Sequence, residues 1–250
     1  MSRFDAILWD VDGTLLNFLY SQRKAISKCL REIGVEPDEE ILQCYSSIND
    51  QYWKRFELGE VTREQLVTGR FSSLFEVYGI TGVDVIAFRK SYEDTLGVVY
   101  AYQENSLEIC KKLHGRIKQY VITNGITAVQ TSKLKLSGFA ELMDDIFISE
   151  QIGVPKPGEA FFARCMERMG EVAGDKSRLL IVGDSLTSDI KGGVLSGIPT
   201  CWYRPDNIFE MDASAKKEYE KYKPDYEISC LNQLFDILEC TDGEIRGTKG

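Results

Sequence analysis

Histidine is almost absent from this chain: His114 is the only one among 250 residues. We expect it at the C-terminal end of a helix and assign it no catalytic role. A chain with a single histidine offers little for Ser–His–Asp chemistry. The seven cysteines are odd in number, widely scattered and without a C-x-x-C pair, so the sequence suggests neither a disulfide framework nor a cysteine zinc site. Reduced thiols of this kind are typical of the cytoplasm.

Positive charge and long apolar runs are also scarce. The formal net charge is −9 and the pI is about 4.9, so the surface as a whole does not attract nucleic acid or anionic membranes. No apolar run approaches the roughly 20 residues that span a bilayer, and the start MSRFDAILWD contains no signal-peptide region. We therefore expect a cytoplasmic protein with a small-molecule partner, and either a monomer or a homodimer.

Short apolar strands alternate with amphipathic helices along most of the chain. This alternation predicts an α/β fold with a Rossmann-like parallel sheet and helices on both faces. Residues 20–98 are helical throughout and too long for a loop. We therefore expect an α/β core formed by residues 1–16 and 100–250, and a helical domain inserted at residues 17–99 over the carboxyl end of the sheet. The strands are expected at residues 4–9, 117–122, 145–149, 179–182, 200–203 and 226–228.

The first strand ends in two carboxylates, Asp10 and Asp12, followed at once by Gly13 and Thr14. Alternate residues of an extended chain point the same way, so both acids can face one site. Two like charges held close together are unfavourable unless a cation or a shared proton relieves the repulsion. The pair taken alone is also compatible with an ordinary solvated turn.

Polar residues follow three further strands. The second strand is followed by Thr123 and Asn124, the third by Lys156, and the fourth by Asp184 and then Asp189. Ligands of open parallel sheets bind at the carboxyl ends of the strands, so these side chains are expected to converge. Oxygen ligands of this kind suit Mg²⁺. Asp189 could alternatively be an acid favoured at a helix N-terminus.

Phosphoryl transfer is the chemistry that needs this set. Asp10 is the candidate nucleophile, and a bound Mg²⁺ together with Lys156 would relieve its repulsion from a phosphate. Asp12 could protonate the leaving oxygen and then deprotonate the attacking water. Thr123 and the free N–H groups of the Asn124-Gly125 turn would hold the phosphate oxygens.

These strand ends resemble the four motifs of the haloacid dehalogenase-like (HAD) superfamily. The first motif, D-x-D-[GS]-T, stands here as DVDGT, and the strand-terminal Thr, the Lys-Pro and the G-D-x-x-x-D pattern follow in order. The resemblance implies Mg²⁺ held by Asp10, Asp184, Asp189 and the backbone carbonyl of Asp12. It also implies that residues 17–99 are a type-1 cap, which opens and closes over the site and selects the leaving group.

Within that superfamily the chain looks most like the cytosolic 5′-nucleotidases that act on pyrimidine and non-canonical nucleotides. The similarity lies in the size of the cap, the continuation DGTLLNF and the segment GDSLTSDIKGG. A sugar-phosphate phosphatase or phosphoglucomutase of the same superfamily stays open, because the four motifs do not select the leaving group. A non-catalytic protein that binds a phosphorylated metabolite is the alternative from another class.

Overall fold

The computed structural model describes residues 2–205 and 213–239 of the chain. Its contacts divide the chain into two compact units, which we call the α/β unit and the helical unit. The α/β unit comprises Met1–Leu16, Tyr102–Gly125 and Gly138–Gly250, and the helical unit comprises Asn17–Ala101 and Ile126–Ser137. The second segment of the helical unit differs from the sequence analysis, which assigned it to the α/β core.

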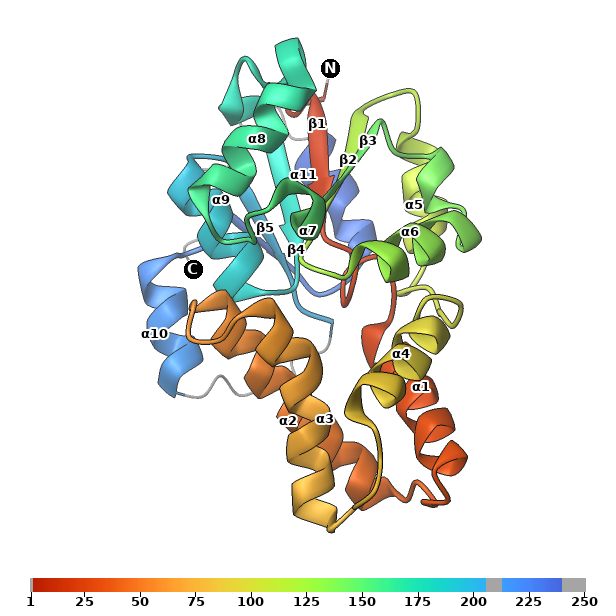
Figure 1. Ribbon diagram of the computed structural model, residues 1–250. Coiled ribbons are helices and arrows are strands. Elements are labelled where there is room, and N and C mark those ends of the chain that lie inside the picture. Colours follow the sequence, from red (N-terminus) through yellow and green to blue (C-terminus); the bar gives the residue numbers. More distant parts are fainter. Residues whose placement is uncertain (1, 206–212, 240–250) are drawn as a thin grey trace. The chain divides into compact units, whose positions relative to one another are not determined.

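A sheet of six strands forms the centre of the α/β unit. Figure 1 shows this sheet with helices packed around it. The strand order is β3-β2-β1-β4-β5-β6, and every neighbouring pair is parallel. In the central strand β1, Ala6 lies opposite both Lys118 of β2 and Leu179 of β4. The predicted Rossmann-like parallel sheet is therefore confirmed. The strands are β1 (Ala6–Trp9), β2 (Lys118–Thr123), β3 (Asp145–Ile148), β4 (Leu179–Gly183), β5 (Thr200–Tyr203) and β6 (Tyr226–Ile228).

Helices cover this sheet because its central strands are apolar along their whole length. On one face, Phe161, Phe162 and Cys165 of helix α8 pack in a buried cluster with Leu8 and Ile122 of the sheet. The helices of the unit are α5 (Ser106–Leu113), α7 (Ser149–Ile152), α8 (Glu159–Met169), α9 (Lys191–Ser196), α10 (Ala213–Lys221) and α11 (Leu234–Glu239).

A buried glutamine connects helix α5 with strands β1 and β2. The Oε1 atom of Gln119 on β2 accepts a hydrogen bond from the indole Nε1 of Trp9 on β1 at 3.2 Å. Its Nε2 donates to the carbonyl oxygen of Cys110 on α5 at 2.9 Å. Because both ends of the amide are paired, this polar side chain is accommodated inside an apolar layer.

The helical unit consists of five helices, four of which begin at a side-chain cap. The side chains of Asn17, Asp38, Thr62 and Asp84 each accept a backbone N–H bond from the first turn of the helix that follows. Thr62 also forms a reciprocal capping box with Gln65. The helices are α1 (Phe18–Glu32), α2 (Glu39–Glu57), α3 (Arg63–Tyr78), α4 (Val85–Leu96) and α6 (Thr127–Leu136).

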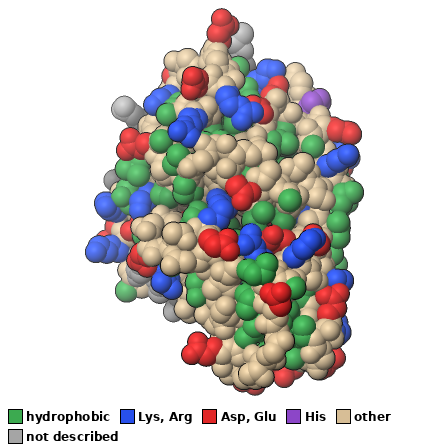
Figure 2. Space-filling model, viewed as in Figure 1, with side chains coloured by type: hydrophobic (Ala, Val, Ile, Leu, Met, Phe, Trp, Pro, Cys, Tyr) green, Lys and Arg blue, Asp and Glu red, His purple; other side chains and the backbone are tan. Residues whose placement is uncertain are grey.

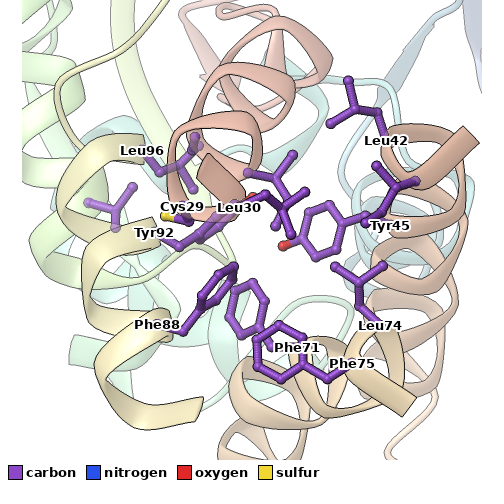
Figure 3. Close-up of a cluster of buried hydrophobic side chains, with 14 residues drawn as sticks. Cys29, Leu30, Leu42, Tyr45, Phe71, Leu74, Phe75, Phe88, Tyr92 and Leu96 are labelled. Atoms are coloured by element: carbon purple, nitrogen blue, oxygen red, sulfur yellow. The ribbon is translucent and has the colours of Figure 1, made fainter. Parts of the chain in front are cut away.

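Aromatic rings fill the centre of the helical unit (Figure 3). Tyr45 stacks on Phe71 with ring centroids 5.7 Å apart, and Phe71 meets Phe88 and Tyr92 edge to face at 5.3 and 5.1 Å. Val129 of α6 is buried in the same cluster. This contact explains why α6 belongs to the helical unit although it follows a strand of the sheet in sequence.

The surface matches the acidic composition. Figure 2 shows acidic and basic side chains interspersed over the visible face, without a broad basic patch on it. Among the described helices, none combines the length and the apolar character that crossing a membrane requires.

We expect Phe71→Ala to destabilise the protein by about 3–5 kcal/mol, because the substitution leaves a cavity between the rings of Tyr45, Phe88 and Tyr92. Val77→Ala is the matched control on the same helix, since Val77 is 63% exposed and should change stability by no more than about 0.5 kcal/mol. Urea unfolding followed by far-UV circular dichroism measures both. Equal midpoints for the two variants would contradict the assignment of Phe71 to the core.

Candidate functional site

The candidate site lies where the central strands of the α/β unit end. Trp9, the last residue of β1, is in register with Val121 of β2 and Val182 of β4. The next residue, Asp10, donates its backbone N–H to the carbonyl oxygen of Val182 at 2.9 Å. Asp10 therefore leaves the sheet at the point where the strand order reverses, which is the usual ligand position in this topology.

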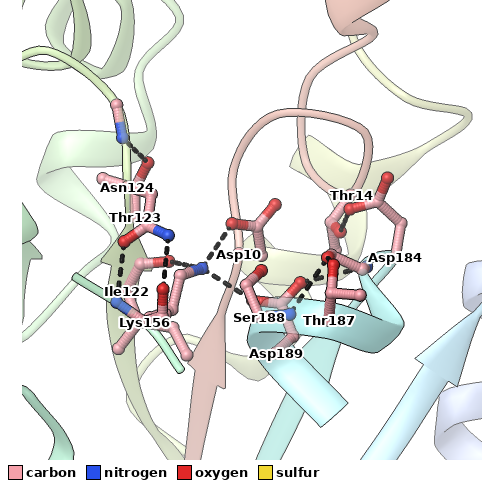
Figure 4. Close-up of polar contacts among 12 residues, drawn as sticks. Asp10, Thr14, Ile122, Thr123, Asn124, Lys156, Asp184, Thr187, Ser188 and Asp189 are labelled. Carbon is pink, nitrogen blue, oxygen red and sulfur yellow. Dashed lines mark hydrogen bonds and ion pairs between the residues drawn. The ribbon is translucent and has the colours of Figure 1, made fainter. Parts of the chain in front are cut away.

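The buried ammonium group of Lys156 lies at the centre of the site (Figure 4). Its Nζ donates to Asp10 Oδ1 at 2.8 Å, to Asp189 Oδ1 at 2.6 Å and to the carbonyl oxygen of Ile122 at 2.9 Å. All three ammonium protons are thus directed at oxygen atoms. Burial by itself would lower the pKa of Lys156, but the negative charges of Asp10 and Asp189 outweigh it and hold that pKa above its usual range.

Three carboxylates gather beside Lys156. One oxygen from each of Asp10, Asp184 and Asp189 lies within 4.8 Å of the others; Asp10 and Asp189 are buried, and Asp184 is exposed. Burial raises the pKa of Asp10 to about 7; Lys156 acts in the opposite direction, and the charge of Asp189 adds to the rise. One ammonium cannot balance three carboxylates. The excess of negative charge and the oxygen-only donor set therefore fit a divalent cation such as Mg²⁺.

Asp189 is the most firmly held of the three acids. It lies in a π-helical turn, Leu186–Ile190, and its Oδ2 accepts the backbone N–H of Ser185 at 3.1 Å while its Oδ1 accepts Lys156. Position 183 must be a glycine to leave room for this side chain, because a Cβ atom there would lie 2.3 Å from Asp189 Oδ2. Both oxygens of Asp189 thus already have protein donors, which fixes the orientation of its carboxylate.

The loop after β1 places Gly13 directly against the side chain of Asp184. Gly13 has a φ of +102°, and a Cβ atom there would lie 2.3 Å from Asp184 Oδ2. Glycine is therefore required at this position for two reasons, backbone conformation and space. Asp12 is half-buried, and its charge contributes to the raised pKa of Asp10, so the two acids interact electrostatically.

The loop after β2 partly differs from the expectation. Thr123 is buried at the strand end as predicted, but its Oγ1 accepts the backbone N–H of Gly125 at 3.1 Å, so that N–H is not directed at a substrate. The side chain of Asn124 faces Lys156: its Oδ1 accepts the Lys156 backbone N–H at 2.8 Å, and its Nδ2 donates to the Lys156 carbonyl oxygen at 2.9 Å. Asn124 therefore positions the lysine.

Two further residues in contact with Asp184 were not predicted from the sequence. The indole Nε1 of Trp202, on β5, donates to the backbone carbonyl oxygen of Asp184 at 2.8 Å. The hydroxyl of Thr14 donates to Asp184 Oδ1 at 3.4 Å. Thr14 belongs to the DVDGT motif and could have been assigned this role, but nothing in the segment TCWY indicates which strand end Trp202 supports.

Known proteins share this sequence pattern. The family described as haloacid dehalogenase-like hydrolase matches residues 4–197. The pyrimidine 5′-nucleotidase PynA of Streptococcus pneumoniae is 35% identical over 236 residues, which cover 93% of this chain and 96% of that protein. The pyrimidine 5′-nucleotidase YjjG of Escherichia coli is 28% identical over 236 residues, covering 94% of this chain and 98% of that protein.

A solved structure with a similar fold covers almost the whole chain. The crystal structure of YfnB from Bacillus subtilis, bound to magnesium and described as revealing interdomain movement, superposes with a TM-score of 0.84. The two sequences are 31% identical, and the match covers 95% of this chain and 100% of that one.

We expect Gly13→Ala to lower the affinity for Mg²⁺ by about tenfold or more, because the new methyl group displaces the Asp184 carboxylate. Gly34→Ala is the control: Gly34 also has a positive φ, +79°, but a Cβ atom there meets nothing within 4 Å. Both variants carry a backbone strain of about 1–2 kcal/mol, so titration calorimetry with Mg²⁺ isolates the steric effect. Unchanged Mg²⁺ affinity in Gly13→Ala would show that Asp184 is not a ligand.

Proposed function

Because the chain belongs to the haloacid dehalogenase-like hydrolase family, we propose that it is a Mg²⁺-dependent phosphatase that acts on phosphate monoesters through Asp10. The resemblance that the strand-end motifs indicated is confirmed, as is the prediction that the protein is an enzyme. The family also contains relatives with different substrates, so the reaction must be argued from the site.

The observation that supports this proposal best is the contact between Lys156 and Asp10 at the end of β1. The ammonium favours the ionised form of the buried Asp10 carboxylate, which is the form that can attack phosphorus. Lys156 uses one carboxylate oxygen of Asp10, and the other oxygen is the candidate nucleophile. Attack forms an aspartyl-phosphate and breaks the bond between phosphorus and the leaving oxygen.

Asp12 is the candidate proton carrier. It would give its proton to the leaving oxygen and then take a proton from the water that attacks the aspartyl-phosphate. That second step releases inorganic phosphate and restores the Asp10 carboxylate. Its half-buried position and its electrostatic interaction with Asp10 support the assignment.

Asp10, Asp184 and Asp189 would hold Mg²⁺, together with the backbone carbonyl of Asp12 that the family resemblance implies. When bound, Mg²⁺ supplies positive charge that offsets the repulsion between a phosphate and these carboxylates. The Thr123 hydroxyl, at the end of β2, is the candidate donor to a phosphate oxygen. Lys156 would share that task only by giving up part of its present hydrogen bonding.

We propose a nucleoside monophosphate as the preferred substrate and the helical unit as the cap that selects it. The names of PynA and YjjG, which describe pyrimidine 5′-nucleotidases, support this substrate class. The acids and the lysine in the α/β unit do not distinguish one phosphate monoester from another, so leaving-group selection is assigned to the other unit. A sugar phosphate is the alternative that the assay below must exclude.

Asp10→Asn should lower turnover by about a thousandfold or more, since an amide cannot form the aspartyl-phosphate. Asp5→Asn in the same unit is the matched control, because Asp5 only pairs with Arg178 at the surface. Phosphate release by the two purified, folded variants is the measurement. Turnover near the wild-type level in Asp10→Asn would remove Asp10 from the role of nucleophile.

Phosphate release from nucleoside monophosphates, sugar phosphates and p-nitrophenyl phosphate, each with Mg²⁺ or with EDTA, tests cofactor and substrate together. We expect hydrolysis to depend on Mg²⁺ and to be most efficient, by kcat/KM, with pyrimidine nucleotides. A preference for sugar phosphates would be consistent with the proposed phosphatase reaction but would overturn the nucleoside monophosphate as the preferred substrate. Absence of turnover with every ester would favour a non-catalytic binding protein.

A further inference from the structure

A buried arginine in the helical unit has no counter-charge among the described residues. Arg70 of α3 is 1% exposed, and one of its terminal nitrogens, Nη1, donates to Asn49 Oδ1 of α2 at 2.8 Å. No carboxylate in the described part of the chain forms an ion pair with it. Its Nε and Nη2 atoms are buried and have no acceptor there. An uncompensated buried charge is unfavourable, and buried donors normally have partners.

The tyrosine beside this arginine does not serve as the missing anion. Burial raises the pKa of Tyr45 well above its usual range, although the charge of Arg70 acts in the opposite direction. The Tyr45 hydroxyl is therefore protonated and neutral at physiological pH.

The orientation of the guanidinium is fixed from two sides. Asn49 holds one end, and the rings of Phe71 and Tyr92 lie 4.8 and 5.0 Å from the guanidinium carbon. The Nε and Nη2 hydrogens lie on one edge of the planar group and point in parallel, which suits a carbonyl oxygen or a pair of acceptors. Figure 3 shows the labelled rings of Tyr45, Phe71 and Tyr92 gathered in this part of the unit.

We propose that the Nε–Nη2 edge of Arg70 binds the carbonyl edge of a nucleobase. This inference rests on the proposed function for its ligand, which would be the base of the nucleotide substrate. Arginine and asparagine are the side chains that proteins use to read base edges through paired hydrogen bonds. Because Arg70 is almost completely buried, the base reaches this edge only when the side chains around it rearrange.

A neutral base fits this position better than a second anion. The two rings already stabilise part of the guanidinium charge through cation–π interaction. The surroundings are mainly aromatic, and their polar atoms include the buried hydroxyls of Tyr45 and Tyr92, so a carboxylate or phosphate would have to lose most of its hydration to enter. A carbonyl oxygen has two lone pairs for the two donors and a much smaller desolvation cost. Uracil and cytosine carry such an oxygen at C2, whereas adenine has none.

Two substitutions test this assignment. Arg70→Met keeps an apolar side chain of similar length and removes the charge and the hydrogen-bond donors. Arg70→Lys keeps the charge but removes the pair of parallel N–H donors. We expect both to weaken the binding of uridine by about tenfold or more in calorimetry, and to raise KM for uridine monophosphate similarly. Turnover of p-nitrophenyl phosphate, which has no base, should stay within about twofold of wild type. Arg31→Met is the control, since Arg31 is exposed and pairs with Glu36 in the same unit.

The outcomes separate this inference from the proposed function. Arg70-dependent binding of uridine without hydrolysis of any ester would support the base site and overturn the phosphatase. Hydrolysis of nucleotides with unchanged KM in both folded variants would overturn the base site alone. An equal loss of turnover with p-nitrophenyl phosphate and uridine monophosphate would show that Arg70 only supports the fold. Arg70-dependent binding of acetate or adenosine instead of uridine would overturn the assignment of the ligand as a base carbonyl. If Arg70→Met does not fold, Arg70→Lys decides.

Discussion

The candidate site depends on one buried ammonium group. Lys156 connects Asp10, at the end of β1, with Asp189, beyond β4, and with the carbonyl oxygen of Ile122 on β2. Without the lysine, two buried carboxylates would face each other, and breaking a buried pair from one side costs about 3–5 kcal/mol. The carboxylates in turn keep the lysine charged. This mutual dependence explains why the acids and the lysine occur together on three different strand ends.

The surrounding chain is organised to hold that ammonium in place. Asn124 binds both backbone groups of Lys156 and thereby joins the loops that follow β2 and β3. Gly13 and Gly183 supply the space in which Asp184 and Asp189 lie. The two glycines and the amide of Asn124 thus help to determine the positions of the charged groups in the site, although they are assigned no catalytic role.

Much of this arrangement could be predicted from local sequence. Apolar runs that end in Asp10, Thr123 and Asp184 identified the strands, and the parallel topology then required their ends to meet. The contacts of Asn124 and Trp202 could not be predicted, because each depends on which loop faces a given side chain after folding. The membership of α6 in the helical unit was missed for the same reason: its sequence does not indicate which unit its buried residues Val129 and Leu134 contact.

The pairing of β1 also limits the order in which the sheet can form. Its residues pair with β2 on one side and β4 on the other, and both partners lie far along the sequence. During translation β1 is made before both of its partners, whereas α1 to α4 are contiguous in the sequence and contact one another. Unpaired apolar strands are prone to pair with other chains. Until β2 and β4 have been synthesised, both edges of β1 therefore lack the partners that they have in the folded sheet.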